Sequence, residues 1–200
     1  CDEHDILLIF DEVITGLGRC GALTAAQLFG VTPDIMTLAK QLTNGAVPMG
    51  AVVASADIYT TFMDAGGPDY LLEFPHGYTY SGHPVACAAA LAALDILEGE
   101  ALPARAARLA PHFEGRLHEL RGAPHVTDIR NFGLAGALQL EHYPGEPARR
   151  PFEVALRMWQ KGFYVRYGGD TIQLGPPFVM EEAQIDDLLA ALGESLAAPA

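Results

Sequence analysis

The sequence predicts an α/β protein in which a mostly parallel sheet with crossover helices is followed by a small α+β domain. Short apolar runs alternate with helix-like segments over the first half, as is typical of buried parallel strands. Half of the 200 residues are apolar, which allows a sizeable core. After Gly122 the pattern changes to short strands around glycines. We expect two domains, 1–105 and 106–200.

The first half is expected to hold three strands separated by helices. Its strands are predicted over 6–10, 35–38 and 48–55, the first two of them buried. Pro33 precedes the second strand and prevents a helix from running into it. Helices are predicted over 22–29, 56–63, 84–98 and 103–121, with Pro84 suited to a first turn.

The second half is expected to form a smaller layer of strands and helices. Its strands are predicted over 126–130, 134–140, 163–167 and 171–175. Its helices are predicted over 152–162 and 181–197, and an acidic turn begins the second of these.

Charge and composition disfavour several classes of function. The net charge of −13 disfavours nucleic acid as a partner, because phosphates would be repelled. No apolar run is long enough to span a bilayer, so no membrane partner is expected. The three cysteines form no C-x-x-C pair and the histidines no H-x-x-x-H pair, so neither a metal site nor a disulfide framework is indicated. A reducing, cytoplasmic location is expected.

An acid and a lysine follow the first two predicted strands. Asp11 comes directly after 6–10, and Lys40, one of two lysines, comes shortly after 35–38. Open α/β sheets bind ligands at the carboxyl ends of their strands. A buried carboxylate needs a cationic partner, and a buried lysine tends to lose its proton and become a nucleophile. Pyridoxal 5'-phosphate (PLP) uses both groups, because its aldehyde forms a Schiff base with lysine and its pyridinium nitrogen pairs with an aspartate.

Three segments carry a resemblance to a known family. They are LLIFDEVITGLGRCG, FGVTPDIMTLAKQLTNGAVPMGAVV and HGYTYSGHPVACAAALAALDILE, and FYVRYGGDTIQLGPPFV near the end extends the likeness. Together they resemble the class III, fold-type I PLP-dependent aminotransferases, in particular the ω-amino acid–pyruvate (β-alanine–pyruvate) branch. The resemblance implies the C-terminal half of such an enzyme: the C-terminal part of the PLP-binding major domain (1–105) and the small α+β domain (106–200).

The resemblance also implies roles for five residues. Lys40 would form the Schiff base and then move a substrate proton, and Asp11 would accept a hydrogen bond from the pyridinium nitrogen. Val13 would pack against a face of the cofactor ring. Thr79 would reach the cofactor phosphate of the neighbouring subunit, which implies a homodimer. Arg166 would pair with the substrate carboxylate.

Each role has a structural alternative. Lys40 could be a surface lysine, and Val13 an ordinary core residue. Thr79 could be a turn threonine, and Arg166 an exposed strand arginine beside Asp170. For two further motif residues we favour the structural interpretation: Glu12 caps a helix, and Arg19 supports a loop.

The implied function is PLP-dependent transamination of an ω-amino acid or amine with pyruvate or a similar keto acid. The partners would be a small-molecule amine and a keto acid. One alternative is an isomerase similar to glutamate-1-semialdehyde aminomutase. The other is a catalytically inactive fragment, because the resemblance covers the lysine-bearing half of the family and not the half that carries its phosphate loop.

Overall fold

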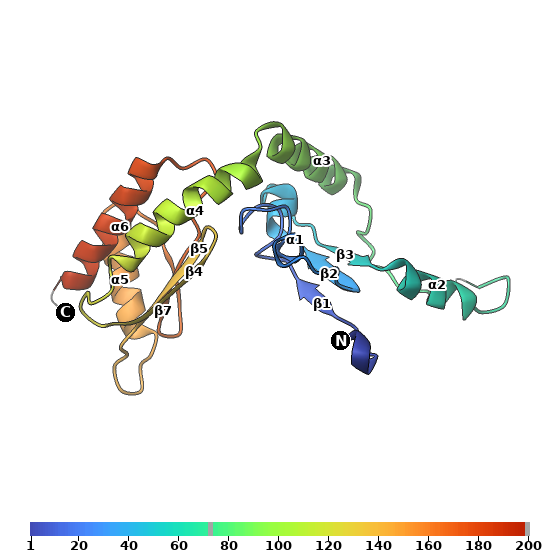
Figure 1. Cartoon of the computed structure of the whole chain (residues 1–200), viewed down its shortest axis with the longest axis horizontal. Coiled ribbons are helices and arrows are strands. Elements are labelled where there is room, and N and C mark those ends of the chain that lie inside the picture. The colour runs from blue at the N-terminus through green and yellow to red at the C-terminus, as the bar shows by residue number, and fades with distance from the viewer. Residues whose placement is uncertain (72–73, 199–200) are drawn as a thin grey trace. The chain divides into compact units, whose positions relative to one another are not determined.

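A computed structural model describes residues 1–71 and 74–198 and divides the chain into two compact units (Figure 1). The first unit comprises 1–18 and 22–101, and the second comprises 19–21 and 102–200. The short segment 19–21 therefore belongs with residues that follow it by more than eighty positions.

The described part of the first unit contains one three-stranded sheet. Its strands are β1 (Ile9–Asp11), β2 (Ile35–Leu38) and β3 (Ala51–Ala54), in the order β1-β2-β3. Strands β1 and β2 are parallel, with Ile9 opposite Ile35 and Asp11 opposite Thr37. Strand β3 runs antiparallel to β2. The parallel pairing places the carboxyl ends of β1 and β2 at the same edge of the sheet.

Hydroxyl side chains cap the starts of two helices of the first unit. The Thr24 hydroxyl accepts a hydrogen bond from Gln27 N at the start of one helix, and the Ser55 hydroxyl accepts one from Ile58 N at the start of another. Pro84 occupies a first turn as expected. The helices are η1 (Asp2–His4), α1 (Ala25–Phe29), η2 (Lys40–Thr43), α2 (Ala56–Asp64) and α3 (Pro84–Gly99).

The prediction that the first two strands are buried is wrong for this chain. Ile9 in β1 is 57% exposed, and β2 is only half-buried. On β3, Val52 is 72% exposed. The apolar composition suits strands covered on both faces, but no fourth strand pairs with the outer edge of β1 among residues 1–71 and 74–198. In its described ranges the first unit therefore presents apolar strand surface and an unpaired edge of β1.

The second unit, as far as it is described, is an antiparallel sheet with three α-helices. The sheet order is β4-β5-β7-β6, and every neighbouring pair is antiparallel. Its strands are β4 (Val126–Phe132), β5 (Ala135–Leu140), β6 (Arg166–Gly168) and β7 (Thr171–Leu174). Its helices are α4 (Leu102–His118), α5 (Arg149–Gln160) and α6 (Glu182–Ala197).

The core of the second unit lies between its sheet and its helices. Fully buried side chains come from α4, β5, α5, β7 and α6: Phe113, Leu117, Leu138, Met158, Ile172, Ile185 and Leu192. Gly136 in β5 allows α4 to approach closely, since a β-carbon there would lie 2.8 Å from both Phe113 Cζ and Leu117 Cδ2. At the start of α6, Glu181 and Gln184 form a capping box.

Two glycine substitutions should change stability in opposite directions. Gly136→Ala should lower the free energy of unfolding by about 1–3 kcal/mol, because the new methyl overpacks against α4. Gly115→Ala, within α4 and with nothing in 4 Å of its β-carbon, should raise it by roughly 0.5–1 kcal/mol through helix propensity. Urea denaturation followed by circular dichroism measures both. A Gly136→Ala variant as stable as the parent protein would contradict the packing described.

Candidate functional site

The carboxyl edge of the β1–β2 pair carries the two residues on which the sequence prediction depends. Asp11 is the last residue of β1, and Lys40 lies two positions beyond the end of β2. Asp11 is opposite Thr37 in the parallel ladder, and Lys40 follows Thr37 by three residues. The structure thus brings Asp11 and Lys40 to one edge of one sheet, although they are far apart in the sequence.

The backbone of Lys40 is unusual. Lys40 begins η2 with φ at +50°, in the left-handed region that long side chains seldom adopt. Such conformations cost of order 1 kcal/mol and cluster at functional sites. The side chain is exposed in this chain. Neither the 3-10 turn nor the left-handed backbone was predicted from the sequence, because no glycine or asparagine stands at this position to indicate them.

One oxygen of the Asp11 carboxylate is held in place by two neighbours. Asp11 Oδ1 accepts hydrogen bonds from Thr37 Oγ1 and from the backbone N–H of Val13, each at 3.1 Å. No hydrogen bond to Oδ2 is found in the part of the chain that the structure describes. The carboxylate is therefore oriented through one oxygen and can accept a ring N–H through the other, as the pyridinium of PLP requires.

Glu12 has the structural role predicted for it. Its side chain is only 1% exposed, and its two oxygens accept hydrogen bonds from Ala25 N at 3.1 Å and Ala26 N at 2.8 Å. These N–H groups lie in the first turn of α1, where no intrahelical acceptor exists. The helix-cap interpretation is confirmed. Glu12 and Asp11 thus serve different purposes: one joins the strand end to a helix, and the other is left with a free oxygen.

Arg19 is also structural, as predicted, and it belongs to the second unit. Its guanidinium donates to Leu134 O at 3.2 Å and to Pro176 O at 2.6 Å, and it lies 4.7 Å from the centre of the Phe178 ring. Burial lowers the pKa of Arg19. Gly133, at φ +56°, is needed beside it, since a β-carbon there would lie 2.5 Å from Cys20 Cα.

Thr79 and Arg166 lie on other segments than the β1–β2 edge, and Arg166 belongs to the second unit. Thr79 is exposed in the turn that Ser81 N closes onto Tyr78 O at 2.9 Å, just before α3. Arg166 begins β6 in the second unit, where it helps to line a cavity of 290 Å³. Within the described ranges Arg166 forms no ion pair with Asp170, which instead accepts hydrogen bonds from Gln139 and Thr171.

The described residues form neither a metal-binding cluster nor a membrane-spanning helix. Among them there is no group of three His, Cys, Asp or Glu side chains that could hold a metal ion. In that same part of the chain, no helix combines the length and the apolar character needed to cross a membrane.

Comparison with known proteins places the chain in a family. The family model for class-III aminotransferases matches residues 1–196, and the chain belongs to that family, whose members depend on PLP. The β-alanine–pyruvate aminotransferase of Pseudomonas aeruginosa is 60% identical over 196 residues, covering 98% of this chain and 44% of that protein. The ω-amino acid–pyruvate aminotransferase of Pseudomonas putida is 58% identical with the same coverage. The chain thus spans less than half the length of these relatives.

Solved structures confirm the fold class. An amine transaminase from an uncultivated Pseudomonas species, in its PLP-bound form, matches with a TM-score of 0.89 at 39% identity. The matched region covers 98% of this chain and 46% of the transaminase. An (S)-enantioselective ω-transaminase from Thermomicrobium roseum matches equally well, with a TM-score of 0.89 at 39% identity. Here the matched region covers 98% of this chain and 44% of the other protein. The α/β sheet and the following strands and helices are therefore those of the aminotransferase fold.

Removing the charge of Glu12 should weaken the fold near the site. In Glu12→Gln one of the two acceptor oxygens becomes an NH₂ donor facing a helix N–H. The free energy of unfolding should therefore fall by about 1–3 kcal/mol. Thermal unfolding measures the change, with the exposed Glu98→Gln on α3 as the control for loss of charge. Equal stability of the two variants would contradict the capping role.

Proposed function

We propose that the chain supplies the lysine-bearing part of a PLP-dependent transaminase. This enzyme would transfer an amino group from an ω-amino acid or amine to pyruvate or a similar keto acid. The observation that carries the proposal is the arrangement at the β1–β2 edge, where Asp11 has a free carboxylate oxygen and Lys40 a strained backbone. The names of the two relatives at 60% and 58% identity support the donor and acceptor classes.

The residues at this edge fit PLP. When bound, PLP supplies a protonated ring that withdraws electrons from the substrate carbon beside the reacting nitrogen. Asp11 Oδ2 would hold the proton of the ring nitrogen, while Thr37 and the Val13 backbone fix the carboxylate through Oδ1. Lys40 Nζ would attach the cofactor covalently and, once displaced by substrate, would carry a proton between substrate atoms. The side chain of Val13 would contact the ring.

Two more residues would complete the site from other places. Arg166 would bind the substrate carboxylate, for which a planar guanidinium is well matched. Thr79 would offer its hydroxyl to the cofactor phosphate of a neighbouring subunit, so the working enzyme would be a homodimer in the cytoplasm. We assign 1–105 to the PLP-binding major domain and 106–200 to the small domain.

The exposed strands support a role within a longer enzyme. Strands β1 and β3 present apolar side chains, and the chain matches only 44% of the length of its relatives. Surface of this kind is normally covered in a finished protein. The chain alone would then be inactive, and activity would need the remaining length that the relatives have. The relatives' names favour transamination over an aminomutase-like isomerisation.

Borohydride labelling tests the assignment of Lys40. After incubation with PLP and reduction, peptide mapping should find the pyridoxyl group on Lys40, and Lys40→Ala should abolish the label. Lys161→Ala is the matched control, because it removes the second lysine, which pairs with Glu194 at 2.7 Å on the other unit. Labelling is compared between the chain alone and the chain joined to the remaining length of its relatives. Label on Lys161, or none in either preparation, would contradict the proposal.

A substrate comparison tests Arg166. In the complete enzyme, Arg166→Gln should raise KM for β-alanine about tenfold to a hundredfold through loss of a charge-assisted pair, while KM for an uncharged amine changes little. Arg108→Gln on α4, also exposed, controls for the lost charge. An equal rise for both donors in Arg166→Gln would contradict a role in carboxylate binding.

A further inference from the structure

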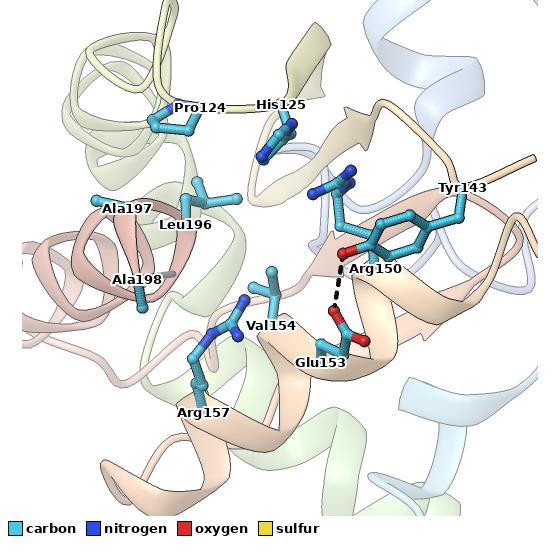
Figure 2. Close-up of a pocket in the computed structure, with 10 residues that line it drawn as sticks. All are labelled: Pro124, His125, Tyr143, Arg150, Glu153, Val154, Arg157, Leu196, Ala197 and Ala198. Atoms are coloured by element: carbon cyan, nitrogen blue, oxygen red, sulfur yellow. Dashed lines mark hydrogen bonds between the residues drawn. The ribbon is translucent and has the colours of Figure 1, made fainter. Parts of the chain in front are cut away.

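A second candidate site lies in the second unit and is lined by none of the residues assigned above. A cavity of about 160 Å³ is bounded by α5, the end of α6, and the segments around His125 and Tyr143 (Figure 2). Its basic lining residues are Arg150, Arg157 and His125, and Val154 and Leu196 contribute apolar wall. A cavity of this volume has room for a compact ion of a few heavy atoms.

The two arginines are held so that their outer nitrogens remain available. Arg150 Nε donates to Glu141 O at 2.6 Å, and its guanidinium lies 4.3 Å from the centre of the Tyr143 ring. Arg157 Nε donates to Ser195 O at 2.9 Å near the end of α6. In the described ranges, neither guanidinium has a carboxylate within ion-pair distance, and neither uses its terminal NH₂ groups in a hydrogen bond. Both side chains are half-buried.

Helix geometry directs both groups to one cavity. Arg150 and Arg157 are seven residues apart on α5, which is close to two full turns, so both lie on the same face. Figure 2 shows Val154 between them along the helix. Arginines in an acidic chain usually find carboxylates, as Arg105, Arg116 and Arg149 do here. Among the described residues Arg150 and Arg157 have no such close ion pair, although the charge of Arg150 acts on the Glu141 carboxylate and helps to lower its pKa, so two half-buried guanidinium groups face the cavity.

The two acidic groups nearby accept hydrogen bonds from residues other than the cavity arginines. Glu153 lines the cavity, but it accepts hydrogen bonds from Arg149 Nε at 3.0 Å and from Tyr143 OH at 3.4 Å. Glu141 accepts from His125 Nδ1 at 2.9 Å, and this hydrogen bond lowers the pKa of Glu141. Among residues 1–71 and 74–198, no hydrogen bond to His125 Nε2 is found. The carbonyls at the end of α6 carry partial negative charge, which Arg157 Nε meets at Ser195.

We propose that this cavity binds a small oxyanion with two negative charges, such as a phosphate group or a short dicarboxylate. Two guanidinium groups match the charge of such an ion, and each can donate two parallel N–H bonds to its oxygens. Val154 and Leu196 limit the cavity to a compact ligand. The site is independent of the transaminase assignment, since none of its residues serves the β1–β2 edge.

Titration with three anions at constant ionic strength tests the proposal. Inorganic phosphate, malonate and acetate are added to the purified chain, and binding is followed by calorimetry. Saturable binding of phosphate, of malonate or of both, tighter than that of acetate, would support the site and identify the preferred oxyanion. Acetate binding as tightly as the dianions, or the absence of saturable binding, would overturn it.

Variants and a local probe show where the anion binds. Arg150→Gln and Arg157→Gln should each weaken binding about tenfold or more, whereas Arg108→Gln should leave it unchanged. Since both cavity arginines also bond backbone carbonyls, the variants could lose their fold. The parent protein is therefore also examined by methyl NMR, in which the Val154 and Leu196 signals should shift with anion concentration. Unmoved methyl signals, or unchanged affinity in both folded cavity variants, would overturn the proposal.

Discussion

The parallel pairing of β1 with β2 is the constraint on which the candidate site depends. It places Asp11 opposite Thr37, so that a threonine hydroxyl from one strand fixes a carboxylate on the next. The same pairing brings the segment after β2, with Lys40, to the same edge. A shift of one residue in this register would turn the Asp11 side chain to the opposite face of the sheet. The backbone pairing of β1 with β2 therefore determines whether the Asp11 side chain and Lys40 lie at the same edge of the sheet.

Asp11, the last residue of β1, and Glu12, which follows it, have different roles. Successive side chains of a strand point to opposite faces. Glu12 accordingly reaches the first turn of α1 and is buried, while Asp11 remains at the exposed edge with one oxygen free. The buried acid fixes the loop that follows the strand, and it thereby supports the Val13 N–H that orients Asp11. The same short segment therefore contributes both to the stability of the fold, through Glu12, and to the orientation of the Asp11 carboxylate, through the Val13 N–H.

Arginines join distant segments of the second unit through backbone carbonyls. Arg105 donates to Phe178 O and Met180 O, and Arg19 donates to Leu134 O and Pro176 O. A guanidinium can serve several carbonyls at once because its donors lie in one rigid plane. Arg150 and Arg157 follow the same pattern with Nε alone. Their remaining donors are what makes the cavity beside α5 a candidate for an anion.

Local signals in the sequence were sufficient for much of this structure. The bounds of β2, the start of α3 at Pro84 and the capping role of Glu12 were all predicted, because the first two depend on neighbouring residues and the third on hydrogen bonds to a helix that begins 13 residues later. The exposure of β1 was not predicted, since burial depends on what packs against a strand from elsewhere.

Contacts between residues far apart in the chain could not be predicted from the sequence either. The membership of 19–21 in the second unit rests on acceptors 115 and 157 residues away from Arg19. The left-handed backbone at Lys40 lacked the glycine that usually indicates one. The roles of Val13, Thr79 and Arg166 came from family resemblance and stay predictions.

The most direct test of the central claim is the protonation state of the cofactor ring. PLP labelled with ¹⁵N in its ring would be bound to the complete enzyme and observed by NMR. The account predicts a resonance at the position of a protonated pyridinium, moving to that of a neutral pyridine in Asp11→Asn. The same resonance in both proteins would contradict the claim that Asp11, oriented by Thr37, holds the ring proton.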